Sequence, residues 1–254
     1  MNQKSTIVIE VVVYNIISAF KAQEGGADRV ELCDNPADGG TTPSYGTLAQ
    51  VRQNLSIDVF AMIRPRGGDF FYSNYEYHAM RHDIEMCKRL GADGVVLGIL
   101  HPDGTLDRER CKRLVDYARP LKVTCHRAFD MTHDPFETLE ACIDVGFDRI
   151  LTAGQQPKAV DGVGCIAELV SRARGRIIII PGSGVNESTV GEIVSKTGVR
   201  EIHVSATRFS ESVMAHRNNA ISTLGSTEGS EYKIRSVDPD RVRKIRLSAE
   251  MKRA

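Results

Sequence analysis

The chain has 254 residues, 41% of them hydrophobic, and its 33 lysine and arginine residues balance 33 aspartate and glutamate residues. A chain of this length buries about three quarters of the surface that its unfolded form exposes, so we expect a single domain spanning residues 1–254. The balanced charge argues against a nucleic-acid partner. No apolar run approaches the roughly 20 residues needed to cross a bilayer, which argues against a membrane protein.

The N-terminus and the cysteines indicate the compartment. Residues 1–6 lead directly into an apolar strand pattern and lack the features of a signal peptide. The six cysteines include no CxxC pair and no compact disulfide or zinc spacing; they lie at positions 33, 87, 111, 125, 142 and 165. Free thiols are typical of a reducing compartment, so we expect a cytoplasmic protein.

Short apolar, β-branched runs alternate with amphipathic helical stretches along the chain, which is typical of repeated βα units. Eight strands are predicted, at residues 7–13, 29–33, 58–64, 94–98, 122–126, 149–152, 176–181 and 200–205. Glycine-containing strings that fit turns from a helix into a strand occur at 25–29, 91–94, 146–149 and 197–200. Eight such units close most economically as a (β/α)8 TIM-type barrel, with an open doubly wound sheet as the alternative.

The last quarter of the chain departs from this repeat. Residues 207–237 form a long polar stretch before a last helix, predicted over residues 238–253. A stretch of this length without regular structure is usually a functional loop, a lid or a subunit contact. We therefore expect an extended loop or a subunit-contact segment here.

Side chains on a barrel strand alternate between the interior and the helix layer. When the long aliphatic side chains are placed outward, a polar set remains inside or at the rim: Glu10, Glu31, Cys33, Arg64, Thr124, His126, Thr152, His203 and Ser205. Most of these lie near the carboxyl ends of their strands, where the loops of barrel enzymes assemble active sites. The sequence therefore predicts a functional site at that end of the barrel.

The charged members of this set are Glu10, Glu31, Arg64, His126 and His203. Two interpretations of their role remain open. In the first, Glu10 and Glu31 neutralise Arg64 in a network that only fills polar space. In the second, these residues are catalytic: a histidine transfers a proton, a glutamate orients it, and Arg64 holds a carboxylate or phosphate. The second interpretation predicts an enzyme that acts on a small anionic, phosphorylated or carboxylated metabolite.

An anion-binding turn is predicted after the seventh strand. The string Pro-Gly-Ser-Gly-Val at 181–185 would bring backbone amides to an anion at a helix N-terminus, with Asn186 as the N-cap. A bare tight turn explains the glycines nearly as well. The predicted anion-binding set is Arg64, Arg66, Gly182, Ser183, Gly184 and Ser205.

Two ligand sets are open for a metal ion. The thiolate of Cys33 would select Cu(I). A harder divalent ion would instead be held by Glu10, Glu31, His126 and His203. Cys125 falls on the face opposite His126, so it need not converge with Cys33.

Seven strings occur in the order found in one protein family: GGADRVELC at 25–33, GGTTPS at 39–44, IRPRGGDF at 63–70, VTCHRAFD at 123–130, RILTAGQ at 149–155, PGSGV at 181–185 and EIHVSA at 201–206. Through these strings the chain resembles the CutC family of copper-homeostasis proteins over about residues 7–232. The strings IRPRGGDF and HRAFD are highly specific.

The resemblance implies a (β/α)8 barrel, a cytoplasmic location, dimeric or higher assembly, and an association with copper. It also implies a cluster at the barrel mouth, comprising Glu10, Glu31, Cys33, Arg64, Arg66, His126, Arg127, Asp130, His203 and Ser205. Two positions depart from the family. Val12 stands where a cysteine is frequent, and Cys125 where phenylalanine is common. This chain therefore offers Cu(I) only Cys33 of a cysteine pair on the first two strands.

Overall fold

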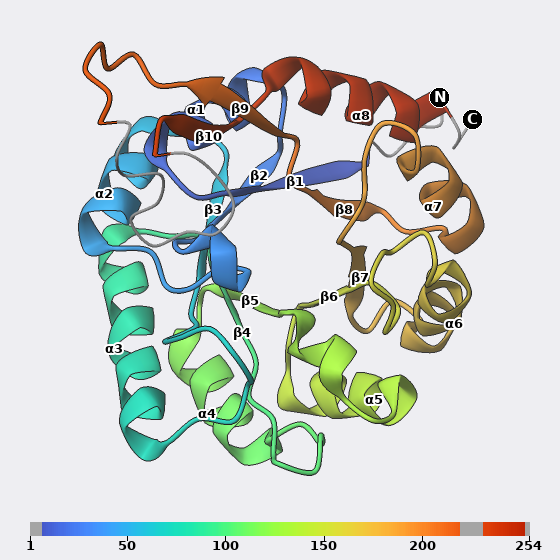
Figure 1. Ribbon diagram of the computed structural model, residues 1–254. Helices are drawn as coiled ribbons and strands as arrows, with labels where there is room; N and C mark the ends of the chain where they lie inside the picture. The colour runs from blue at the N-terminus through green and yellow to red at the C-terminus, as the bar shows by residue number, and fades with distance from the viewer. Residues whose placement is uncertain (1–6, 219–230, 252–254) are drawn as a thin grey trace.

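The computed structural model describes residues 7–218 and 231–251. Eight parallel strands form a ring with helices around it, which confirms the predicted (β/α)8 barrel (Figure 1). The strands are β1 Val8–Val13, β2 Arg29–Leu32, β3 Asp58–Met62, β4 Gly94–Leu97, β5 Lys122–Cys125, β6 Arg149–Thr152, β7 Ile178–Pro181 and β8 Glu201–Val204. The order β7-β6-β5-β4-β3-β2-β1-β8 leaves β7 and β8 as two edges that lie side by side, so the barrel is nearly closed.

Amphipathic helices cover the outside of this ring. They are α1 Ile16–Glu24, α2 Tyr45–Asn54, α3 Asn74–Leu90, α4 Arg108–Ala118, α5 Pro135–Val145, α6 Val163–Ala173, α7 Val190–Thr197 and α8 Pro239–Met251, with short 3-10 turns η1 Pro36–Asp38 and η2 Arg127–Met131. Aliphatic side chains between helices and strands form one large buried core. Among the described residues, no helix is both long and apolar enough to cross a membrane.

The barrel interior has its own small apolar cluster, separate from the core beneath the helices. Val12, Cys33, Phe60, Met62 and Val96 form it. The interior is therefore partly apolar and partly polar, because the charged residues described below occupy the remaining inward positions.

Inward-facing glycines make room for large side chains in this interior. An added Cβ would lie 2.6 Å from the Phe60 ring at Gly94 and 2.9 Å from the His126 ring at Gly98. The backbone at the start of β4 and directly after it thus approaches these rings more closely than a residue with a side chain would allow.

The segment 207–237 is more ordered than expected. Its two ends, β9 Thr207–Glu211 and β10 Lys233–Val237, pair as an antiparallel ribbon, so the prediction of a stretch without regular structure is wrong for these ends. Residues 219–230, between them, lie outside the described residues, as do residues 252 and 253 of the predicted last helix. Figure 1 shows the ribbon beside α1 and α8, projecting from the barrel.

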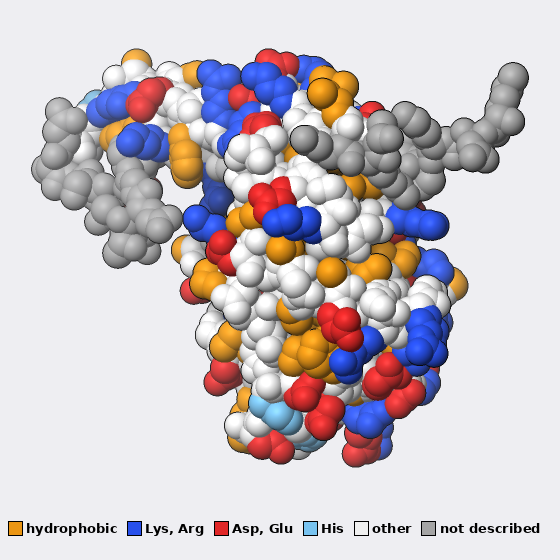
Figure 2. All heavy atoms as spheres, turned by 90° about the vertical axis from the view of Figure 1, so that its right-hand side faces the viewer, with side chains coloured by type: hydrophobic (Ala, Val, Ile, Leu, Met, Phe, Trp, Pro, Cys, Tyr) orange, Lys and Arg blue, Asp and Glu red, His pale blue; other side chains and the backbone are white. Residues whose placement is uncertain are grey.

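Charged side chains of both signs are interspersed on the face shown in Figure 2. This mixture is what the equal numbers of acidic and basic residues lead one to expect. That face therefore presents no single-sign surface of the kind that attracts a polyanion.

Candidate functional site

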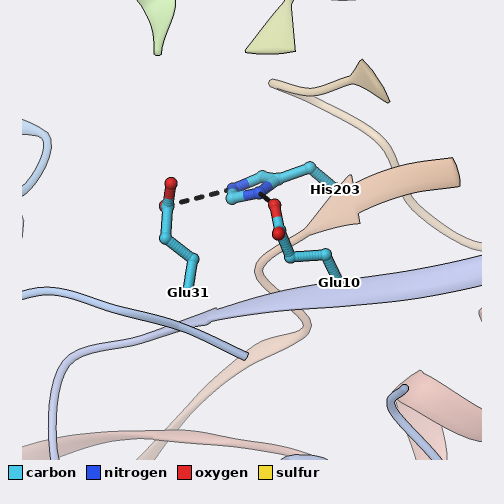
Figure 3. A group of neighbouring side chains, drawn as sticks. All are labelled: Glu10, Glu31 and His203. Atoms are coloured by element: carbon cyan, nitrogen blue, oxygen red, sulfur yellow. Dashed lines mark hydrogen bonds and ion pairs between the residues drawn. The ribbon is translucent and has the colours of Figure 1, made fainter. Parts of the chain in front are cut away.

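The centre of the candidate site is a row of three side chains inside the barrel, Glu31, His203 and Glu10 (Figure 3). His203 lies between the two carboxylates: Nδ1 is 2.7 Å from Glu10 Oε1, and Nε2 is 3.9 Å from Glu31 Oε2. Their strands β2, β1 and β8 are neighbours, and Glu10 is in register with His203. The exposed fractions of Glu10, Glu31 and His203 are 1%, 3% and 9%, so the row is shielded from water.

A buried arginine neutralises one end of this row. Arg29 Nε donates to Glu10 Oε2 at 2.5 Å, and Arg29 Nη2 donates to Glu201 Oε2, also at 2.5 Å. Arg149 Nε reaches the same Glu201 oxygen at 3.0 Å. The prediction that Arg64 neutralises Glu10 is therefore wrong. Arg29 takes that role because it is in register with Glu10 on the adjacent strand.

The three side chains differ in how readily they ionise. Burial opposes ionisation of Glu10, but the charge of Arg29 and the hydrogen bond with His203 outweigh it and lower the pKa to about 2. Burial raises the pKa of Glu31 to about 7. Burial also disfavours a charged His203, yet the carboxylates of Glu31 and Glu10 raise its pKa. Glu10 is thus a fixed anion, whereas Glu31 changes protonation near neutral pH.

Cys33 lies two residues beyond Glu31 and also points inward. Its thiol donates to Glu31 Oε2 across 3.6 Å, and burial raises the pKa of the thiol well above its usual value. A Cβ added to Gly40 would lie 3.1 Å from Cys33 Sγ and 3.6 Å from Met62 Cε. The Cys33 sulfur and the terminal methyl group of Met62 therefore lie near the same point. Val12 packs in the same cluster and offers no donor.

Arg64 and His126 form a second group, joined by Phe70. The Phe70 ring centre is 5.0 Å from Arg64 Cζ and 4.8 Å from the centre of the His126 ring. Arg64 also donates to two backbone carbonyls of the loop after β2 and to one of the loop after β3, so it ties these loops together. Burial, with the charge of Arg64, lowers the pKa of His126 to about 3, so this ring is neutral at physiological pH.

Four buried polar atoms of the predicted site lack a hydrogen-bond partner among the described residues: Glu31 Oε1, Arg64 Nε, Thr124 Oγ1 and His126 Nε2. Nδ1 of His126 accepts from the backbone N–H of Ala128 at 3.2 Å, so the neutral ring carries its proton on Nε2. Native proteins satisfy most buried polar groups. A ligand would therefore find one hydrogen-bond acceptor, on Glu31, and three donors, on Arg64, Thr124 and His126.

Other predicted residues order the loops and do not reach this row. Arg66 binds Glu76 through Nε at 2.6 Å. Arg127 binds Asp130 at 2.7 Å, and Asp130 accepts from Thr152 Oγ1 at 2.5 Å. Ile150 packs in the core beneath the helices, so the period of two places Thr152 on the same outward side of β6, and its predicted inward position is wrong.

The glycine turn after β7 packs tightly against its neighbours. A Cβ on Gly182 would lie 2.5 Å from Leu151 and 3.3 Å from His203 Cδ2, so this glycine makes room for the His203 ring. Ser183 Oγ donates to the carbonyl of Pro157 at 2.7 Å. Gly184 has a positive φ of 68°, and a Cβ there would touch the stem of Lys158. Ser205 is exposed at the end of β8.

The turn does not open a helix directly. Helix α7 begins at Val190 with Thr189 as its N-cap, so the prediction of Asn186 as the N-cap is wrong. The Asn186 side chain instead accepts from the backbone N–H of Ser188 at 2.9 Å and closes a separate turn. The predicted anion-binding amides are therefore not at the N-terminus of a helix.

Three residues of the site were missed from the sequence: Arg29, Glu201 and Met62. The signal was present, because a period of two from Glu31 places Arg29 on the inward face, and a period of two from His203 does the same for Glu201. Met62 precedes Arg64 by two residues in the same way.

Comparisons with known proteins agree over most of the chain. The model of the CutC family matches residues 7–208. The human copper homeostasis protein cutC homolog is 44% identical over 242 residues, which cover 95% of this chain and 89% of the human protein. The CutC protein of Parabacteroides distasonis is 48% identical over 237 residues, covering 93% of this chain and 98% of that protein.

Solved structures give the same result. The crystal structure of the copper homeostasis protein CutC from Streptococcus agalactiae superposes with a TM-score of 0.76 at 35% identity, covering 79% of this chain and 99% of that one. Thiamine phosphate pyrophosphorylase from Pyrococcus furiosus has a TM-score of 0.60 at 16% identity over the whole of both chains, and it shares the fold alone. The family match, the identities of the relatives and the shared barrel show that this chain belongs to the CutC family.

Proposed function

We propose that this protein takes part in copper homeostasis and binds copper as Cu(I) at the barrel mouth, with Cys33 as its thiolate ligand. The names of the human and streptococcal relatives connect them with copper homeostasis. The observation that carries the proposal is the approach of the Cys33 thiol and the Met62 side chain to the same point. Soft sulfur ligands of this kind select Cu(I) over harder ions.

The ligands that we propose are one thiol, that of Cys33, and one thioether, that of Met62, which lies in the same cluster. Val12 packs beside Cys33 and contributes only methyl groups, so β1 supplies no second thiol. A thioether binds Cu(I) without losing a proton, whereas the thiol must be deprotonated. Copper affinity at Cys33 is therefore expected to rise with pH.

A Cu(I) titration under anaerobic conditions against a competing chelator tests this proposal. We expect Cys33→Ser to weaken binding by at least about tenfold, the lower end of what loss of a ligand's supporting group costs. Met62→Leu, which keeps the volume and removes the sulfur, is expected to weaken it less. Cys165→Ser, on α6, is the control and should bind as the parent chain does. Equal affinity in Cys33→Ser and the parent chain would rule out Cys33.

We also propose a cytoplasmic location and a homodimer. All six cysteines are free, which supports a reducing compartment. The exposed apolar side chains Phe209 and Ile234 on the β9–β10 ribbon support a subunit contact.

A second candidate function is an enzyme that acts on a small anionic metabolite. It is favoured by three buried donors that have no hydrogen-bond partner in the part of the chain that the structure describes, Arg64 Nε, Thr124 Oγ1 and His126 Nε2. These atoms match the oxygens of a phosphate or carboxylate. In a thermal-shift screen of such metabolites, a ligand of this site should stabilise the parent chain and not Thr124→Val, with Thr47→Val, at the start of α2, as the control. A screen without a stabilising compound would contradict this candidate.

A further inference from the structure

Glu31 and His203 are arranged as two ligands of a metal ion different from copper. We propose that the barrel holds a divalent first-row transition-metal ion, of the Zn²⁺ class, between His203 Nε2 and the carboxylate of Glu31. Glu10 orients His203 and does not bind the ion. This inference does not rest on the copper proposal, because the ion and its ligands differ.

The orientation of His203 is the first support. Nδ1 of the ring is 2.7 Å from Glu10 Oε1, and the other Glu10 oxygen is held by Arg29 at 2.5 Å. With the ring proton on Nδ1, the lone pair of Nε2 points toward Glu31 (Figure 3). Metal-binding histidines almost always donate their other N–H to a carboxylate, carbonyl or water in this way. Both Glu10 oxygens are already engaged, so this carboxylate serves as the supporting group.

The separation of the two ligands is the second support. Nε2 of His203 and Oε2 of Glu31 are 3.9 Å apart, which is too long for a hydrogen bond. A Zn²⁺ ion between these two atoms can lie about 2.0 to 2.2 Å from each of them, which is the usual distance for nitrogen and oxygen ligands. The Oε1 atom of Glu31 is buried and has no partner among the described residues, so this carboxylate has an oxygen free for an ion.

The charges of the interior network favour a cation at this point. Two arginines, Arg29 and Arg149, interact with three carboxylates, those of Glu10, Glu31 and Glu201. In the protonation state that binds a metal, with His203 neutral and Glu31 ionised, two positive and three negative charges leave one negative charge in excess. A buried charge that lacks a partner is costly, and an ion between Glu31 and His203 supplies the partner.

The donor types select the class of ion. Imidazole with a carboxylate suits zinc and other divalent transition metals, whereas Ca²⁺ and Mg²⁺ prefer oxygen ligands alone. In the described residues the ligand atoms of Glu10, Glu31 and His203 lie within 4.8 Å of one another, and Cys33 does not belong to this group. The site is therefore chemically distinct from the sulfur pair at the mouth.

The experiment titrates Zn²⁺ into the metal-free full-length chain against a chromophoric chelator. We expect about one Zn²⁺ per chain, with affinity at least about tenfold lower in Glu31→Gln and His203→Gln, and lowered about 10- to 100-fold in Glu10→Gln. The matched control is His133→Gln. His133 Nε2 lies 3.8 Å from Glu137 Oε2, nearly the same separation, but on the exposed surface.

The outcomes separate this site from the copper site. The Cys33→Ser variant should bind Zn²⁺ as the parent chain does, because serine retains a donor to Glu31. The same variant should lose Cu(I) affinity. Glu31→Gln keeps the size of the side chain, and urea unfolding of each metal-free variant verifies its fold. No zinc binding by the parent chain, equal affinity in the parent and a folded Glu31→Gln or His203→Gln variant, or loss in His133→Gln would each overturn the proposal.

Discussion

Glu10 keeps its charge inside the barrel because two groups bind it from opposite sides. Arg29 takes one carboxylate oxygen and His203 the other. An isolated buried carboxylate would be neutralised by a proton, since burial disfavours the charged form. The low pKa of Glu10, about 2, shows that these partners outweigh burial. Because it is a fixed anion, Glu10 also fixes the orientation of the His203 ring.

Two glycines are as necessary to the site as the histidines. A Cβ on Gly98 would lie 2.9 Å from the His126 ring, and one on Gly182 would lie 3.3 Å from the His203 ring and closer still to Leu151. Real Cβ atoms rarely approach so closely, so a larger residue would displace the rings. Gly98, directly after β4, and Gly182, in the turn after β7, thus determine where the two imidazole rings lie.

At the scale of secondary-structure elements, the turns from helix to strand repeat one arrangement. In three of them a glycine is followed two residues later by an aspartate, at positions 28, 93 and 148. Each aspartate accepts a hydrogen bond from a backbone N–H of the preceding strand, from Ile9, Val59 and Val123 at 2.7, 2.8 and 2.8 Å. Each also pairs with an arginine, which is Arg246, Arg52 or Arg119. The arrangement joins adjacent βα units at the amino-terminal end of the barrel.

Asp148 gives a pH-dependent test of this arrangement. Burial opposes its ionisation, but the hydrogen bonds from Val123 and Arg119 outweigh it and lower the pKa. A carboxyl whose pKa is lower in the folded state stabilises the fold above its unfolded pKa of about 3.9 and loses this effect as pH falls. We expect Asp148→Ala to lower the free energy of unfolding by about 1 to 3 kcal/mol at neutral pH, because the buried N–H of Val123 loses its acceptor.

Urea unfolding at neutral pH and at about pH 3 measures both parts of this prediction. The difference between Asp148→Ala and the parent chain should narrow at the lower pH. Asp144→Ala is the control, since Asp144 forms an exposed ion pair with Arg108 that contributes about 0 to 1 kcal/mol. A difference that stays constant with pH would show that the charge of Asp148 does not stabilise the turn.

For the whole molecule, the order of elements could be predicted because the strands are strongly patterned. Runs such as residues 7–13 and 176–181 are β-branched and apolar, and each observed barrel strand lies within its predicted range. The ribbon of β9 and β10 was not predicted. Its strands are exposed and polar, with Arg208, Ser210 and Arg235 among apolar residues, so no buried face produces a clear alternation.

The site could be predicted only in part. The alternation of side chains along a strand shows which face of the sheet a side chain is on, but it does not show which residue that side chain contacts. It placed Glu10, Glu31 and His203 on the inward face, where the structure brings them together. The rule that long aliphatic side chains face outward fails at Leu151, which packs inside the barrel beside Gly182, and this reversed the assignment of Thr152. The partners of Arg64 are carbonyls of two loops, and their positions follow from loop folding that no strand pattern encodes.

The β9–β10 ribbon gives the last prediction, which concerns assembly. It is a two-stranded sheet of its own, anchored at one end where the Asn15 amide donates to the carbonyl of Arg235 at 3.0 Å. Phe209 and Ile234, which the register places on opposite faces of the ribbon, are 57% and 49% exposed, so each face carries an exposed apolar side chain. Exposed apolar groups on such a ribbon favour packing against another surface. We expect that surface to belong to a second copy of the chain.

Analytical ultracentrifugation over a range of concentrations tests this contact. The parent chain should sediment as a dimer, and a double variant with Phe209→Ser and Ile234→Ser should shift toward the monomer, because it removes the apolar area that drives association. Tyr75→Ser is the matched control, since Tyr75 is 89% exposed on α3, away from the ribbon. A parent chain that stays monomeric at every concentration, or a double variant that remains fully dimeric, would show that the ribbon is not the subunit contact.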